Sequence, residues 1–197
     1  RLLLDWKNVN ETYILQGKMA LFKEHLDYFD EETNLISLSN FTTLTSEING
    51  QKFWKNNHKL LAGITHSYTT ANNDGYLNPP TENRSAIQFS YFFQQKKLKL
   101  QASIRQGLID GKIIPTVPSL GFDYAFFPWL NLQGKVSRNY RVPTLNDRFW
   151  NGGGNENLNP ESGWSQEATI HSPLKIGQSS FTFSLTGFNR NIDQWIL

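Results

Sequence analysis

Apolar and polar residues alternate along most of this chain. Within residues 97–105 the even-numbered residues from Leu98 to Ile104 are apolar, and every odd-numbered residue is polar. A period of two predicts a β-strand with one apolar and one polar face. Leu61 and Phe92 are the two exceptions to an alternation that recurs at 60–69, 87–93, 119–126, 130–139 and 180–186.

Weaker patterns complete the set at 2–6, 13–26, 40–53 and 164–172, although the two faces of 40–53 cannot be assigned from the sequence. The sequence therefore predicts about ten strands of roughly 9–13 residues, longer than the usual 5–6 residues of soluble sheets. Tilted strands that cross a membrane need such a length. No stretch shows a competing helical pattern.

The connections between these strands alternate in length. Short links at 7–11, 54–58, 95–96, 128 and 174–177 alternate with long links at 27–39, 71–83, 109–117 and 141–163. This order predicts an all-β fold, an antiparallel up-and-down transmembrane β-barrel with short periplasmic turns and long extracellular loops. Aromatic rings near strand ends suit the headgroup boundary, and they belong to Tyr91, Phe93, Tyr124, Phe126, Phe127, Trp129 and Trp164.

Composition narrows this picture. Lys plus Arg number 19 and Asp plus Glu number 17, so the charge balance gives no argument for a nucleic-acid partner. The chain has no cysteine, and no apolar run approaches the ~20 residues of a membrane-spanning helix. About ten strands with a wet face cannot close alone, so we expect partner strands from a larger barrel of about 22 strands with a plugged lumen.

The longest polar segment, 141–161, has a composition that favours a defined loop shape. Pro143 and Pro160 fix φ, while the glycines at 152–154 tolerate positive φ. Its Asn and Asp residues can bond their own backbone. The segment is therefore predicted to be a structured loop between two strands.

Two spaced motifs in this segment carry a resemblance. They read Arg-x-Pro-Thr-x-Asn-Asp and, after an aromatic pair, Gly-Asn-x-x-Leu-x-Pro-Glu. In this order they resemble the C-terminal barrel signature of TonB-dependent outer-membrane receptors, and they are most similar to the branch of the vitamin B12 receptor and its relatives. The residues concerned are Arg141, Pro143, Thr144, Asn146, Asp147, Gly154, Asn155, Leu158, Pro160 and Glu161.

The resemblance implies a function for the whole protein. It implies TonB-dependent import of a scarce large nutrient, a corrinoid or an iron chelate such as a ferric siderophore, across the outer membrane of a Gram-negative bacterium. Loops would capture the nutrient, and TonB would move a plug that closes the lumen. We expect residues 1–197 to be part of one transmembrane β-barrel domain in contact with outer-membrane lipid, with the plug domain and the TonB-contacting segment outside this sequence.

Side chains that could carry chemistry are few. The histidines His25, His58, His66 and His171 lack metal-ligand spacing, so we interpret each as an isolated polar residue and predict neither a metal site nor a cofactor. No Ser-His-Asp elbow or phosphate loop occurs, which argues against an enzyme. We expect Asp123 and Glu167 to project into the lumen among Lys99, Arg105, Lys135 and Arg190, as a solvated charge network rather than an acid/base pair.

Nutrient-binding candidates lie in the predicted outward loops. Phe149, Trp150 and Asn151, with Tyr76 and Asn78 of the second long link, place rings and amides where a large solute would first arrive. The alternative is that these residues only pack the loops against each other.

Alternation alone does not distinguish the inside of a fold from its outside. A soluble or surface-attached β-sandwich or lipocalin-like binding module, with the apolar faces turned inward, is therefore the alternative to the barrel. A passive porin is a third hypothesis. Strand length and the order of short and long links favour the receptor barrel.

Overall fold

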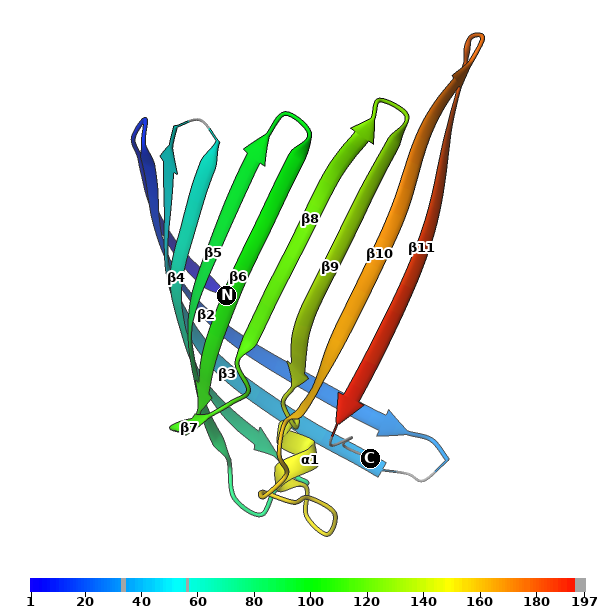
Figure 1. Cartoon of the computed structure of the whole chain (residues 1–197). Coiled ribbons are helices and arrows are strands. Elements are labelled where there is room, and N and C mark those ends of the chain that lie inside the picture. Colours follow the sequence, from blue (N-terminus) through cyan, green and yellow to red (C-terminus); the bar gives the residue numbers. More distant parts are fainter. Residues whose placement is uncertain (33–34, 56, 194–197) are drawn as a thin grey trace.

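The computed structural model describes residues 1–32, 35–55 and 57–193. These residues form one antiparallel sheet in the order β1-β2-β3-β4-β5-β6-β8-β9-β10-β11, with β7 paired to β6 (Figure 1). The elements are β1 (Leu2–Val9), β2 (Tyr13–Asp30), β3 (Leu35–Trp54), β4 (His58–Asn73), β5 (Thr81–Gln95), β6 (Leu98–Ile109), β7 (Lys112–Ile113), β8 (Val117–Phe127), β9 (Leu130–Arg141), α1 (Leu145–Phe149), β10 (Glu161–Ile176) and β11 (Ser179–Asp193). The predicted all-β, up-and-down arrangement is confirmed.

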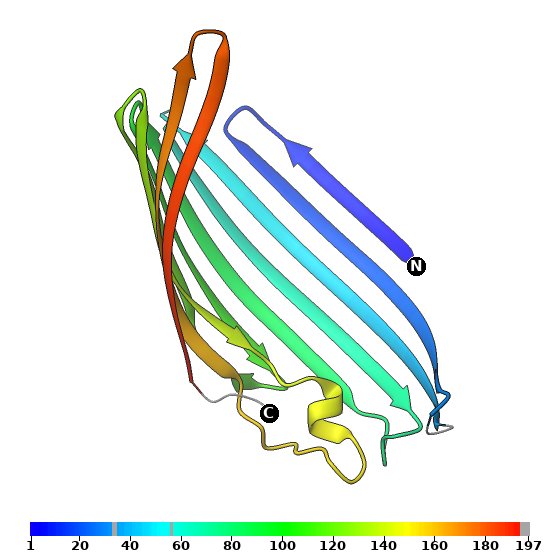
Figure 2. The ribbon, with the colours of Figure 1, turned by 90° about the vertical axis from the view of Figure 1, so that its right-hand side faces the viewer.

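The sheet is open and strongly curved. Figures 1 and 2 show β1 and β11 as its two edges, on either side of a concave face. The sheet therefore has the form of a section of curved wall. A helix with the length and hydropathy of a membrane span is not found among the described residues.

All ten predicted strands are present. β6, β8 and β9 have the predicted length, β1 is slightly shorter, and the other six are longer than predicted. β3 has 20 residues and β2 has 18. At the end of β2, residues 23–29 are exposed on both faces, so the alternation fades before the hydrogen-bonded ladder ends. At the start of β3 the exposed Ile36 and Leu38 alternate with the buried Ser37 and Ser39, but this run is short. The alternating part of the longer strands is thus shorter than their hydrogen-bonded ladder.

Two of the four predicted long links consist largely of strand and turn residues. β2 continues to Asp30 and β3 begins at Leu35, so most of the predicted loop 27–39 is strand. The predicted loop 109–117 is mostly a continued hairpin, in which Asp110 and Gly111 have φ of +49° and +78°. Positive φ at both positions is the signature of a type I′ turn, which Asp-Gly favours. The Asp110–Gly111 pair is therefore a local sequence signal for this turn.

The remaining long connections are residues 74–80 and 142–160, called here the 74–80 loop and the 142–160 loop. The second contains α1, so the prediction of a chain without helix is wrong at this point. The rim that carries both loops is the long-loop rim. The opposite, short-turn rim is formed by the predicted short links, which are confirmed between β1 and β2, β3 and β4, β5 and β6, β8 and β9, and β10 and β11 (Figure 1).

The two faces of the sheet differ in polarity. Ile48, Ile64 and Ile87 lie in one register row across β3, β4 and β5, and their exposed fractions are 60%, 58% and 41%. This row also assigns the faces of residues 40–53, which the sequence left open. The apolar side chains Leu100, Phe122 and Phe183 are exposed as well. A sandwich or lipocalin-like module would bury such rows, whereas a membrane barrel turns them toward hydrocarbon.

The buried core is small and lies near the long-loop rim. It consists of apolar residues from strand ends and loops, namely Ala71, Tyr76, Ala86, Ile109, Ile114 and Pro143. Packing of these residues supports the two loops at this rim.

Candidate functional site

The short helix α1 is fixed by its first turn. Thr144 is the N-cap: its Oγ1 accepts a hydrogen bond from the Asp147 N–H at 3.1 Å, and the Thr144 N–H donates to Asp147 Oδ2 at 2.8 Å. This reciprocal pair is a capping box. The hydrogen bonds from the Thr144 backbone and then from its side chain lower the pKa of Asp147, and the nearby Arg141 charge adds to the effect.

The signature residues at the two ends of the 142–160 loop meet in space. The Arg141 guanidinium lies 3.3 Å from Glu161 Oε1 and 3.7 Å from Asp147 Oδ2. Asn155 N–H donates to the Asp147 carbonyl at 2.9 Å, which brings the second motif back to the first. These contacts give the signature a structural role in shaping the loop.

The 74–80 loop and the 142–160 loop are joined directly. Asn151 N–H donates to the Gly75 carbonyl at 2.8 Å, and the Tyr76 hydroxyl donates to Asn146 Oδ1. The rings of Tyr76 and Trp150 meet edge to face with centroids 6.4 Å apart. Burial raises the pKa of Tyr76. The two loops therefore form one unit, called here the loop bridge (Gly75, Tyr76, Asn146, Trp150 and Asn151).

Arg148 ties this unit to the sheet. Its Nη1 lies 3.1 Å from Glu82 Oε2 at the start of β5, and its Nη2 lies 3.2 Å from Asp110 Oδ2 in the β6 turn. The guanidinium carbon also lies 4.7 Å from the centroid of the Phe149 ring. Sequence reasoning missed Arg148, Glu82 and Asp110, since partners 66 and 38 positions apart leave no local pattern.

A hollow of about 320 Å³ lies between the two loops at the long-loop rim, and it is called here the outward pocket after the predicted sidedness of this rim. Its lining includes four of the five predicted nutrient-binding residues, Asn78, Phe149, Trp150 and Asn151. The fifth, Tyr76, is only 8% exposed and lies against Trp150. The structure thus brings all five together, with Tyr76 in a packing role; whether the other four bind a nutrient stays a prediction.

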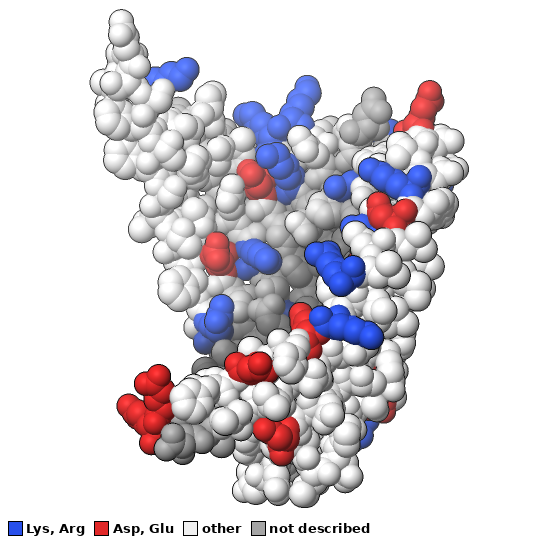
Figure 3. All heavy atoms as spheres, turned by 180° about the vertical axis from the view of Figure 1, so that it is seen from behind, with Lys and Arg blue, Asp and Glu red and all other residues white. Residues whose placement is uncertain are grey.

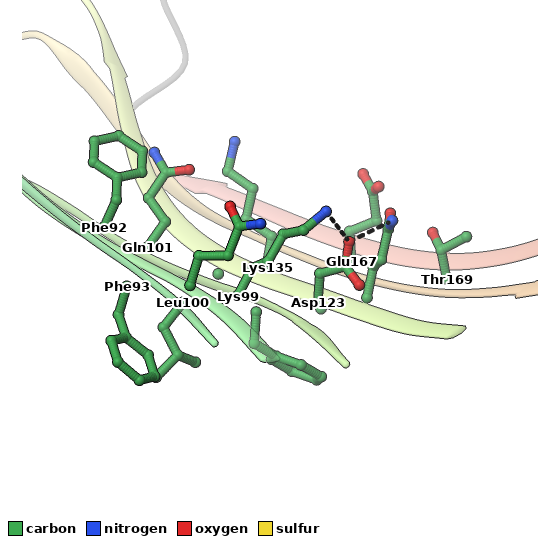
Figure 4. Close-up of a pocket in the computed structure, with 14 residues that line it drawn as sticks. Phe92, Phe93, Lys99, Leu100, Gln101, Asp123, Lys135, Glu167 and Thr169 are labelled. Atoms are coloured by element: carbon green, nitrogen blue, oxygen red, sulfur yellow. Dashed lines mark hydrogen bonds and ion pairs between the residues drawn. The ribbon is translucent and has the colours of Figure 1, made fainter. Parts of the chain in front are cut away.

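The concave face of the wall carries charges of both signs (Figure 3). Figure 4 shows Lys99, Asp123, Lys135 and Glu167 on one side of the sheet, around a hollow of about 420 Å³, with Leu100 on the other side. Lys99 Nζ lies 3.7 Å from Asp123 Oδ2. Exposed pairs at such distances contribute little stability, as expected for a solvated network.

Two other predicted members of this network are on the same face but make different contacts. Arg105 Nη1 donates to Gln88 Oε1 at 3.2 Å, and Arg190 is paired in register with Ser165. The exceptional Phe92 points to the polar side in Figure 4, where the Lys59 ammonium lies 4.3 Å from the centroid of its ring. A cation over the ring explains how this aromatic side chain is accommodated there.

Aromatic side chains gather at the short-turn rim. Phe127 and Trp129 stack with centroids 5.3 Å apart, and Tyr124 and Phe126 meet edge to face at 4.7 Å. His58 stacks on Trp54 and its Nδ1 is 2.7 Å from the Tyr91 hydroxyl. The interpretation of His58 as an isolated polar residue is therefore wrong: its ring is part of an aromatic cluster.

The other histidines have polar neighbours. His66 and His171 lie within hydrogen-bonding distance of Ser85 and Ser184, and His25 contacts Asn40 and Asp27. Within residues 1–32, 35–55 and 57–193, no three His, Cys, Asp or Glu side chains are grouped as metal ligands would be. The loop bridge and the outward pocket are thus the most developed candidate site.

Comparison with known proteins decides the family. The family model described as TonB dependent receptor-like, beta-barrel matches residues 4–197. The chain belongs to this family. TonB-dependent receptor barrels are outer-membrane proteins of Gram-negative bacteria, so the exposed apolar face of this barrel wall is its lipid face.

Relatives of this TonB-dependent receptor barrel include two proteins described as vitamin B12 transporter BtuB. The protein from Photobacterium profundum is 21% identical over 85% of this chain, and the protein from Vibrio vulnificus is 27% identical over 60%. The matched residues span only 28% and 20% of the length of these relatives.

Two solved structures share the fold. The FrpB iron transporter from Neisseria meningitidis has a TM-score of 0.73 at 13% identity, and the siderophore receptor PirA from Pseudomonas aeruginosa has a TM-score of 0.67 at 14% identity. Each match covers 96% of this chain, and 35% and 44% of the respective solved chain. At such identities the likeness establishes the fold, and the receptor barrel is thereby confirmed as the architecture.

Proposed function

We propose that the full-length protein imports a scarce large nutrient, a corrinoid or an iron chelate, across the outer membrane by a TonB-dependent mechanism. In this proposal residues 1–197 form part of the wall and the outward loops. A plug domain contacts the charged concave face, and TonB acts through a segment outside this chain. The function requires no enzymatic step in the wall.

The outward pocket carries this proposal. A family of nutrient receptors needs a capture surface on its outward side, and here aromatic rings and amides from two loops converge in one hollow. The loop bridge and Arg148 hold that hollow in place before any nutrient arrives, which reduces the entropy lost on binding. The names of the relatives, which transport vitamin B12 or iron, support the same nutrient classes.

Removal of residues 152–157 tests the role of the loop. The deletion removes the glycine-rich turn beside the pocket, so binding of cyanocobalamin or ferric siderophore, and the corresponding uptake by cells, should fall. Unchanged affinity together with unchanged uptake would contradict a capture role. Uptake that persists in cells without TonB would favour a passive pore.

A single substitution gives a sharper test. Phe149→Ala removes a ring from the pocket lining and should weaken nutrient binding about tenfold or more, since burying one such side chain contributes about 1.5–3 kcal/mol. Trp129→Ala is the matched control, because it removes an exposed ring at the short-turn rim, far from the pocket along the strands. Equal effects of both variants on affinity, measured with purified full-length receptor, would argue against the pocket.

A further inference from the structure

The charge of the outward pocket bears on which nutrient it admits. The cation in its lining is Arg148, and that guanidinium is already bound to Glu82 and Asp110 and packed on Phe149. Its side chain is only 16% exposed. A new anion would have to compete with two carboxylates already in place, at a cost in desolvation and repulsion.

Neighbouring charges do not supply a replacement. Glu82 also binds Arg84, so these two arginines and the two carboxylates Glu82 and Asp110 balance each other. Arg84 lines a different hollow, and Lys112 lies in the hollow on the other side of Glu156. Glu156 itself lines the outward pocket and is exposed. The pocket lining therefore offers the solvent a carboxylate rather than a cation.

The two loops that line the pocket are acidic. Residues 74–80 and 142–160 contain three acids, Asp74, Asp147 and Glu156, and one base, Arg148, which gives a formal charge of −2. A field of this sign repels an approaching anion within roughly the 8 Å screening length of physiological salt. It leaves the approach of a neutral molecule unaffected.

The uncharged part of the lining suits a large neutral molecule. Trp150 and Phe149 offer ring surface, and the amides of Asn78 and Asn151 can both donate and accept hydrogen bonds. Carboxamide groups around a macrocycle, as in a corrinoid, or the amide-like groups of a neutral ferric trihydroxamate, match that lining. A ferric tricatecholate, with its three negative charges, does not.

We propose that the outward pocket selects electrically neutral, amide-bearing chelates and rejects anionic ferric chelates. This inference rests on the proposed function and adds a substrate class to it. Arg148 is then a positioning residue, neutralised by Glu82 and Asp110, and Glu156 is the residue that determines the selectivity against anions.

The test measures binding of three probes to purified full-length receptor in detergent: cyanocobalamin, a neutral ferric trihydroxamate and an anionic ferric tricatecholate. At least one neutral probe should bind about tenfold or more tightly than the anionic probe. The neutral probes should be insensitive to salt, whereas any binding of the anionic probe should strengthen as salt screens the repulsion. The two neutral probes separate a corrinoid from a hydroxamate nutrient.

Two charge-reversal substitutions test whether Glu156 determines the selectivity against anions. Glu156→Lys should raise affinity for the anionic probe several-fold and leave the neutral probes unchanged, while Glu11→Lys at the short-turn rim should change neither. Tighter binding of the anionic probe to the unsubstituted receptor, or no response to Glu156→Lys, would overturn the selectivity and leave import standing. Failure of all three probes to bind or enter cells would instead contradict the proposed function itself, and the selectivity with it.

Discussion

Arg148 shows how one side chain determines the geometry of the candidate site. Its guanidinium joins the 142–160 loop to β5 through Glu82, whose side chain is 5% exposed, and to the β6 turn through Asp110. Charge-assisted hydrogen bonds of this kind are stronger when partly buried. Arg148 lies between Asp147 of the capping box and Phe149 of the pocket lining, so it holds the part of the loop that carries both features.

Replacement of Arg148 should loosen the loop without unfolding the wall. Arg148→Gln leaves Glu82 paired with Arg84 but removes the link to α1. This should lower the free energy of local unfolding of the 142–160 loop by about 2 kcal/mol. Hydrogen exchange of residues 142–160 in the full-length receptor should accelerate, while the strands stay protected. Arg190→Gln on β11, the same chemical change on the concave face, should leave that exchange unchanged. Equal protection in both variants would show that the tie is dispensable.

The capping box predicts a pH response. Because the folded state lowers the pKa of Asp147, its ionised form stabilises α1; that contribution is complete above the ordinary aspartate value of 3.8 and is lost as pH falls through the lowered pKa. The protection of the amides at residues 145–149, relative to the intrinsic exchange rate at each pH, should therefore fall on acidification below about pH 4. Asp147→Asn, which does not titrate, should abolish this pH dependence. A dependence that survives the substitution would assign it to another group.

At the scale of elements, the loop bridge depends on a glycine. A Cβ on Gly75 would lie 2.5 Å from the Trp150 ring, whereas a Cβ on Gly187 of β11 would meet nothing within 4 Å. The close approach of the two loops therefore requires the absence of a side chain at residue 75.

Gly75→Ala should displace Trp150 and separate the two loops. Protease added to intact cells should then cleave the 142–160 loop faster, and nutrient affinity should fall. Gly187→Ala introduces the same methyl group into open space and should alter neither measurement. If the loop of Gly75→Ala resists protease as the unsubstituted loop does, Trp150 can adjust and the bridge does not depend on this contact.

Elements differ in how far the sequence predicted them. The middle of each strand was predictable because water and lipid impose opposite preferences on alternate residues, as in Lys99 and Leu100. The end of β2 was not, because residues 23–29 are exposed on both faces. The start of β3 was not, because its alternating run, Ile36 to Ser39, is too short to mark a strand. The Asp110–Gly111 turn carried a readable signal, whereas the ties of Arg148 and Tyr76 depend on partners distant in sequence, which no local pattern reveals.

At the scale of the whole molecule, the open sheet separates two environments. Its exposed apolar face fits the hydrocarbon of the outer membrane and its concave face carries the charges (Figure 3). The residues Ile64 and Thr65 are neighbours in β4 that point to opposite faces, and they provide a direct test of this sidedness.

Ile64→Arg should destabilise the full-length barrel by about 2–4 kcal/mol, the cost of an arginine on the lipid face near the middle of the bilayer. Thr65→Arg places the same side chain on the polar face and should cost much less. Denaturant unfolding of receptor folded into lipid vesicles measures both free energies. A larger loss for Thr65→Arg than for Ile64→Arg would reverse the assignment of the two faces.

The tie made by Arg148 also has a consequence for the order of assembly. Its two carboxylates come from the β4–β5 and β6–β8 hairpins, and the arginine comes from the chain that follows β9. The loop cannot take its final shape until the strands of these earlier hairpins have paired in the sheet. Ordering of residues 142–160 would thus report that this part of the barrel has been completed, and a conformation-specific antibody against the loop could time that event during insertion.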